Sequence, residues 1–357
     1  TTLSAALALL GARLGRRVLV LTIDPARRLA DALGLEGMGH APQRIAPEIL
    51  ARLGVPPEGE LSAAMLDMKR TFDELVARFA RSDAERERIL RNPIYQHVSD
   101  ALAGSAEYSA MEKVYQLSES KDLDLVVLDT PPTRHALDFL EAPDRMMSFL
   151  DTSVLRFFLK PYFVAGRLTL KIATRTGALA LSLVDKYLGL QFLQDLSEFF
   201  LAFEGLYDGF KDRAARVFEL LRDPNSGFVL VASPAHLTLE EALYFHRRLA
   251  EKKMPFVSLV VNRLHPDPAG GSGVSSRAAP RLAPAFAEKL VAVHRDLRTL
   301  ARSERRGLLR LEVDAGVPPI LVPELETDVH DLRGLAEVAG AIFGTMPLRA
   351  RRRMAAS

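Results

Sequence analysis

Two acidic side chains of this chain stand directly after apolar runs. Asp129 follows Leu125–Leu128, and Asp24 follows Val18–Ile23. Apolar runs without polar alternation are typical of strands buried on both faces of a parallel sheet. Such sheets place their ligands at the carboxyl ends of their strands. Carboxylates, water and phosphate oxygens are the ligands that Mg²⁺ prefers. The two acids therefore predict a site for a metal ion and a phosphate group. For Asp129 taken alone, the alternative is a strand that happens to end in Asp before a Pro-containing turn.

The first residues predict a second part of the same site. An Ala/Leu-rich helix opens at Thr1-Thr2 and is closed by Gly15. In a Walker A motif a Gly-rich loop and a Lys directly precede the Ser or Thr that ligates Mg²⁺. We therefore expect the sequence to begin inside this motif, with Thr1 as the Mg²⁺ ligand. An ordinary amphipathic first helix is the alternative, which Thr-Thr alone does not exclude.

Composition narrows the class of protein. Of 357 residues, 48% are hydrophobic, and 47 basic against 45 acidic residues leave a net charge of +2. This balance does not indicate a nucleic-acid partner. The 357 residues include no Cys, so they cannot form a disulfide, a zinc-thiolate site or a cysteine nucleophile. No apolar run approaches the roughly 20 residues that span a bilayer. We therefore expect no integral membrane span and a cytoplasmic location.

The residue pattern predicts an α/β fold of the P-loop NTPase class, with a mostly parallel sheet flanked by helices and a large α-helical subdomain. Apolar runs predict further strands at 227–234, 256–262 and 308–313. Helices are predicted at 238–252, 285–305 and 329–342. Thr238 and Glu241 have the spacing of a capping box for the first of these. Surface loops are predicted at 265–284 and 318–323.

Two long stretches between the strands have a helical pattern. After Asp31, and notably from Leu61 to Leu90, apolar residues recur every three or four positions; Leu150–Leu221 is the second stretch. We predict one domain over 1–357, divided into a nucleotide-binding core, a helical subdomain and a basic tail. The core is expected at 1–40, 121–145 and 226–345, the subdomain at 60–120 and 146–222, and the tail at 346–357.

The second helical stretch contains more apolar residues than one helical face requires. Burial between packed helices is the default interpretation. The alternative is an exposed groove that holds a hydrophobic helix. The residues that would line this groove are Phe157, Phe158, Phe163, Phe192, Phe199 and Phe200.

Together these features resemble the ArsA family of P-loop ATPases. That family includes the arsenite-pump ATPase subunit and the cytosolic ATPase that targets tail-anchored membrane proteins. Thr22–Ala26 looks like its switch I, and Asp129–His135 resembles its switch II and Walker B segment. Asn262, after an apolar strand, is similar to the Asn that reads adenine, and Pro323–Leu325 falls where the adenine-side loop would lie. The resemblance covers nearly the whole chain.

The resemblance implies ATP and Mg²⁺ as cofactors and a homodimer as the working state. Asp24 and Asp129 would be catalytic, with Asp24 orienting or activating the attacking water and Asp129 holding the metal together with Thr1. A helix N-cap is the alternative role for Asp24. The nucleotide would contact Thr1, Thr2, Asn262, Pro323 and Glu324. The switch residues would be Pro25, Ala26, Thr130, Pro131, Pro132, Thr133 and His135.

Three arginines depart from the family pattern. Arg27 and Arg28 stand where the family usually has His and Asn, and Arg134 where it often has Gly. They would either tune the switch segments or remain solvated on the surface. Without Cys, these residues cannot form the thiolate site that captures arsenite, nor the Cys-x-x-Cys pair of the eukaryotic targeting factors.

The predicted function is that of an ATP-hydrolysing dimer switch. Hydrolysis of Mg-ATP would be coupled to movement of the helical subdomain. That subdomain would bind a hydrophobic helical client or a membrane-associated partner. The alternatives are a subunit of an anion-transport pump, of a type that does not use arsenite thiolates, and a non-catalytic nucleotide-binding interaction protein.

Overall fold

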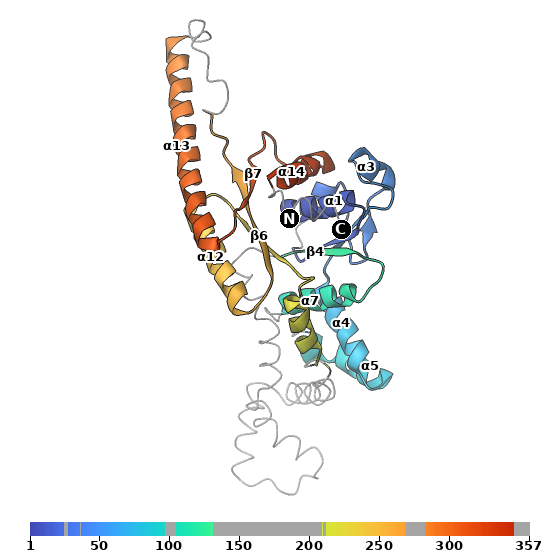
Figure 1. The fold of residues 1–357 in the computed structure, drawn as a ribbon. Coiled ribbons are helices and arrows are strands. Elements are labelled where there is room, and N and C mark those ends of the chain that lie inside the picture. Colours follow the sequence, from blue (N-terminus) through green and yellow to red (C-terminus); the bar gives the residue numbers. More distant parts are fainter. Residues whose placement is uncertain are drawn as a thin grey trace, which may run out of the picture. The chain divides into compact units, whose positions relative to one another are not determined.

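The computed structural model describes residues 1–24, 28–35, 37–96, 105–130, 209, 212–268 and 283–345 (Figure 1). They divide into two compact units. Unit 1 comprises Thr1–Ala64, Lys121–Asp129 and Leu220–Ser357, and unit 2 comprises Met65–Ser120 and Thr130–Glu219.

Unit 1 contains a first sheet with the strand order β2-β3-β1-β4. β1 (Arg17–Thr22) and β4 (Leu125–Asp129) pair in parallel, and their register places Thr22 beside Asp129. The antiparallel pair β2 (Gln43–Arg44) and β3 (Glu60–Met65) extends the sheet on the other side of β1. The last residues of β1 and β4 therefore stand side by side at one edge.

A second, fully parallel sheet follows in the same unit. Its order is β5 (Phe228–Ala232), β6 (Phe256–Leu264) and β7 (Ile320–Pro323). The register of β6 against β7 shifts between Val261 and Leu264, where Arg263 has a φ of +62°. Mostly parallel sheets flanked by helices confirm the predicted α/β class.

The core of unit 1 forms around α1 (Thr2–Arg13), whose side chains are buried on nearly every side. Because its buried residues include four alanines and Gly11, neighbouring elements approach the helix closely. A Cβ on Gly11 would lie 2.9 Å from Leu125 Cδ2 of β4. The same core includes residues of the last helix, α14 (Leu332–Thr345): Leu335, Val338, Ala339 and Ile342. The remaining helices around this sheet are α2 (Arg28–Leu33) and α3 (Pro47–Arg52).

Two helices cover the second sheet. α12 (His236–Glu251) contributes Leu239 and Ala242 to a separate core cluster. α13 (Pro284–Ala315), the long orange helix beside α12 in Figure 1, contributes Leu308 and Leu311. From Ala301 to Leu311, one buried face of α13 therefore packs on its own chain.

Unit 2 is helical in its described part. It contains α4 (Met68–Phe79), α5 (Asp83–Arg91), α7 (Ser105–Ser118) and a helical segment that includes Arg213. The side chains of Asp67 and Ser82 cap α4 and α5 by accepting from the backbone N–H groups of Arg70 and Glu85, at 2.9 and 3.2 Å.

The structure corrects the predictions for three segments. The strand expected at 308–313 is part of α13, because the buried positions Ala301, Glu304, Leu308 and Leu311 have helical spacing. The loop expected at 318–323 contains β7. The helical pattern expected from Leu61 begins instead with strand β3, and helix starts at Met68.

Smaller differences concern the ends of elements. β1 ends at Thr22, so Asp24 lies two residues beyond the strand, and β6 continues past Asn262 to Leu264. The capping box is wrong: α12 begins at His236, and the Thr238 hydroxyl, inside the first turn, donates to the carbonyl of Ser233 at 2.8 Å. Within the described ranges, no helix combines the length and the apolar character needed to cross a bilayer.

Candidate functional site

Asp129, the last residue of β4, is the centre of a hydrogen-bonded cluster. Its side chain is buried, with 4% of the residue exposed. Ser4 Oγ donates to Asp129 Oδ1 at 2.8 Å, and Thr22 Oγ1 donates to Oδ2 at 3.1 Å. The backbone nitrogen of Thr1 lies 2.9 Å from Oδ1. The cluster thus joins the carboxyl ends of β1 and β4 to the beginning of α1.

The amino-terminal end of α1 gives this cluster the character of an anion site. Thr1 is the N-cap, and the first turn carries no acidic residue. The first N–H groups of a helix have no partner within the helix, and the helix dipole adds a partial positive charge there. Phosphate groups bind at such helix ends. The Asp129 carboxylate therefore lies beside the amino-terminal end of α1. The binding of a metal by Thr1 and Asp129 stays a prediction.

The atoms around Asp129 fit Mg²⁺. The side chains that bond to it are hydroxyls, and oxygen ligands suit this hard cation. Because both carboxylate oxygens already accept hydrogen bonds, Asp129 would hold the ion through a water molecule. Across the described ranges, no three His, Asp or Glu side chains are grouped to hold a metal by themselves. Phosphate oxygens and water would complete the coordination.

Asp24 lies close to this cluster through its backbone. The Asp24 N–H donates to Thr22 Oγ1 at 3.2 Å, and the neighbouring Ile23 N–H donates to the Asp129 carbonyl at 3.3 Å. The Thr22 hydroxyl is therefore bonded to the side chain of Asp129 and to the backbone of Asp24. Thr130 follows Asp129 as an exposed residue. Outside the described residues lie the other predicted switch residues, Pro25, Ala26, Pro131, Pro132, Thr133 and His135, and also Arg27 and Arg134.

A second polar cluster stands at the carboxyl ends of β6 and β7. His265 Nδ1 lies 2.7 Å from Glu304 Oε1, and His265 Nε2 lies 2.9 Å from Glu324 Oε2. The backbone N–H of His265 donates to Glu304 Oε2 at 3.0 Å. Pro323 ends β7 and pairs with Leu264 of β6, and the backbone N–H of the next residue, Glu324, donates to the Leu264 carbonyl at 3.0 Å. Of the predicted adenine-side residues, Glu324 is thus linked to Glu304 of α13 by the imidazole ring of His265, and Pro323 is paired with Leu264 of β6.

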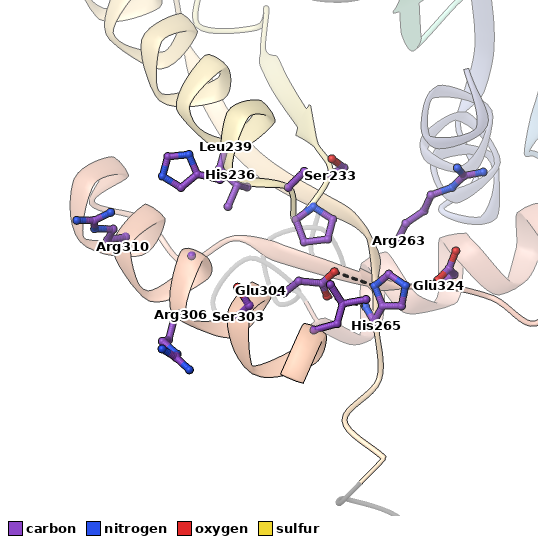
Figure 2. A pocket seen from close by; sticks show the side chains of 14 residues that line it. Ser233, His236, Leu239, Arg263, His265, Ser303, Glu304, Arg306, Arg310 and Glu324 are labelled. Atoms are coloured by element: carbon purple, nitrogen blue, oxygen red, sulfur yellow. Dashed lines mark hydrogen bonds and ion pairs between the residues drawn. The ribbon is translucent and has the colours of Figure 1, made fainter. Parts of the chain in front are cut away.

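A cavity of about 700 Å³ opens beside this cluster. Figure 2 shows Glu304 and His265 facing one another across its lining, with Ser233 and His236 on the β5–α12 side. Asn262 is not among the residues that line it. Its side chain is partly buried on β6. The predicted contact of Asn262 with adenine stays a prediction.

Sequence motifs missed three residues of the two clusters: Ser4 beside Asp129, and His265 and Glu304 beside Glu324. Thr22 lies in the segment that resembles switch I, but no role was predicted for its side chain. Ser4 was identifiable in part, because it lies one helical turn from Thr1 and therefore on the same face of α1. His265 and Glu304 are 39 residues apart, and no local pattern connects them. The predicted groove residues Phe157, Phe158, Phe163, Phe192, Phe199 and Phe200 lie outside the described residues.

The chain is similar to a family of known proteins. The model of the family described as anion-transporting ATPase matches residues 1–279. The chain is 24% identical over 318 residues to the ATPase get3 of Aspergillus terreus, an alignment that covers 87% of this chain and 84% of the relative. It is 23% identical over 353 residues to the putative arsenical pump-driving ATPase 1 of Aquifex aeolicus, covering 97% and 76%. A match to the ATPase GET3 of Malassezia globosa is 29% identical over 157 residues and spans 44% of this chain and 41% of that relative.

Proposed function

Because this chain belongs to the ArsA family of anion-transporting ATPases, we propose that it binds Mg-ATP beside Asp129 and hydrolyses it. The observation that carries the proposal is the buried Asp129 carboxylate, bonded to Ser4 in the first turn of α1 and to Thr22 at the end of β1. Thr1 and Thr2, at the amino-terminal end of α1, would contact the phosphates. Asn262, Pro323 and Glu324 would contact the base.

ATP hydrolysis depends mainly on how the reacting groups are positioned. Phosphoryl transfer requires an aligned water molecule and neutralisation of charge on the transferred group. Mg²⁺, when bound, supplies part of that neutralisation. The N–H groups of α1 would supply another part. Asp24, whose backbone is bonded to Thr22, would orient the attacking water or accept its proton.

We also propose that hydrolysis moves the helical unit in a homodimer, and that this unit binds a hydrophobic helical client through the six phenylalanines already named. The support is the family membership and the apolar character of 150–221. The second candidate is a subunit that drives a membrane pump, favoured by the family description and by the name of the Aquifex relative. A helical peptide of about 20 apolar residues should stimulate ATP turnover in the first case and not in the second.

The catalytic proposal is tested by ATP turnover in the full-length protein and its Asp24→Asn variant. We expect Mg²⁺-dependent turnover to fall by about 10²-fold or more, while ATP affinity changes little, because the amide keeps the size of the side chain but accepts no proton. Asp314→Asn, an exposed change near the end of α13, is the control. Equal loss of turnover and ATP affinity would make Asp24 a structural residue. No turnover in the unmodified protein would leave a nucleotide-binding scaffold.

A further inference from the structure

The amino-terminal half of α13 carries an apolar stripe that no described residue covers. Its members are exposed by 38–55%: Phe286, Leu290, Val293, Leu297 and Leu300. Monomeric proteins rarely leave such a row of large apolar side chains in contact with water. From residue 285 to residue 300, α13 has no buried residue. The stripe is therefore a surface available to a second molecule.

The spacing of the stripe is that of a coiled coil. The five residues follow one another at intervals of four, three, four and three positions. This is the alternation of a and d positions in a heptad repeat, in which Leu290 and Leu297 take a and the other three take d. At Ala301 and Glu304 the same stripe turns into the buried face of α13. The part available to a partner helix therefore ends at Leu300.

We propose that this stripe joins two copies of the chain through an antiparallel pair of α13 helices. In an antiparallel coiled coil, a positions face d positions. Pairing Leu290 with the partner's Val293 also pairs Phe286 with the partner's Leu297, and the N-cap Ala283 with the partner's Leu300. The two helices therefore overlap over the exposed half of α13. The overlap ends at Leu300, after which other residues of the same chain bury one face of the helix.

Charges beside the stripe favour this arrangement. The g positions are Lys289 and Asp296. In the antiparallel register each Lys289 faces Asp296 of the other copy, so symmetry forms the pair twice. In a parallel pair Lys289 would face His294, and Asp296 would face Ala301, which is already buried. The surface thus complements itself in charge, which identifies a second copy of this chain as its occupant.

The proposal is tested by sedimentation of the full chain without nucleotide, which separates this contact from an ATP-dependent dimer. We expect a reversible dimer at about 100 μM. Leu290→Ser should raise its dissociation constant at least about tenfold. Leu309→Ser, at an exposed leucine of the same helix outside the stripe, is the matched control and should leave it unchanged. A monomer at that concentration, or a dimer that Leu290→Ser does not weaken, would overturn the proposal.

The direction of the helices has its own test. Lys289→Glu should weaken the dimer, and adding Asp296→Lys should restore it. Because the chain has no Cys, single cysteines can report the register. A Leu290→Cys chain mixed with a Val293→Cys chain should form a disulfide-linked dimer on oxidation, and each alone should not. Crosslinking of Leu290→Cys with itself would show a parallel pair and contradict the antiparallel register.

Discussion

A hydroxyl group in the first turn of α1 holds the carboxylate that ends β4. Ser4 and Thr22 bond to different oxygens of Asp129, which fixes the carboxylate in one orientation. A ligand fixed before the metal arrives loses less conformational freedom on binding. The two hydroxyls should therefore influence metal affinity without contacting the metal.

Ser4→Ala should separate this orienting effect from folding. We expect the Mg²⁺ concentration for half-maximal ATP turnover to rise several-fold, because Asp129 Oδ1 loses its partner at 2.8 Å. The free energy of unfolding should fall by about 1 kcal/mol. A Mg²⁺ titration of turnover checks the first expectation. Ser118→Ala, at an exposed serine that bonds to the Tyr115 carbonyl, is the control. An unchanged Mg²⁺ requirement would reject the orienting role of Ser4.

Asn262→Ala tests the predicted reading of adenine. The Asn side chain offers both a donor and an acceptor to the edge of a base, so its removal should reduce the preference for ATP over GTP by about tenfold. Competition binding of the two nucleotides measures this preference. Unchanged discrimination would assign base selection to other residues.

At the scale of elements, the sequence predicted a helix or strand correctly where its residue pattern fitted only one of the two. The runs that end at Asp24 and Asp129 could be interpreted as strands because they are continuously apolar. Leu308–Val313 is interrupted by Arg310 and Glu312, and its apolar residues satisfy both a short strand with polar alternation and one helical face. Contact with β6 and α12, which no local pattern contains, decides between the two. β3 was missed because its apolar residues merge into the pattern of α4.

The paired strands β1 and β4 are also joined at their opposite ends. Arg17 Nη2 lies 2.8 Å from Asp124 Oδ1, and the Arg17 backbone N–H donates to Oδ2 at 2.8 Å. The hydrogen bonds from the Arg17 side chain, followed by the one from its backbone, lower the pKa of Asp124 to about 2 from the usual 3.8. The ionised carboxylate therefore helps to hold the two strands in register.

This shift predicts a pH dependence in acid. A carboxyl whose pKa is lower in the folded chain stabilises the fold above its unfolded pKa and loses that effect as pH falls through the folded pKa. Asp124→Asn should therefore lower the melting temperature slightly at pH 6. The difference from the unmodified chain should shrink between pH 4 and pH 2. Melting curves across this range check it, and a difference that is constant with pH would contradict it.

At the scale of the whole molecule, unit 2 contains a buried ion pair of its own. Arg213 Nε lies 2.9 Å from both oxygens of Glu112, and the two side chains are 4% and 0% exposed. Burial acts to lower the pKa of Arg213, but the hydrogen bond with Glu112 and the surrounding negative charges outweigh it and raise the pKa. Arg213 also lies over the ring of Tyr115, 3.8 Å from its centroid. This pair ties α7 to the segment that returns the chain towards unit 1.

Glu112→Gln should therefore destabilise unit 2 selectively. Leaving a buried guanidinium without its carboxylate costs about 3 kcal/mol or more. Hydrogen exchange resolved by segment should show faster exchange in α4 and α7, with β1 and β4 unaffected. Glu74→Gln, which removes a partly exposed pair with Lys113 at 3.2 Å, should cost less than about 1 kcal/mol. Equal acceleration in both units would show that they unfold together.

The packing of α14 on α1 has a consequence for the order in which the chain folds. Leu335, Val338, Ala339 and Ile342 cover a helix that precedes them by more than 300 residues of chain. During synthesis from the amino-terminal end, the alanine-rich surface of α1 therefore stays open until α14 has left the ribosome. A chain that stops before Leu332 would keep every strand of both sheets and still lack the cover over its first helix.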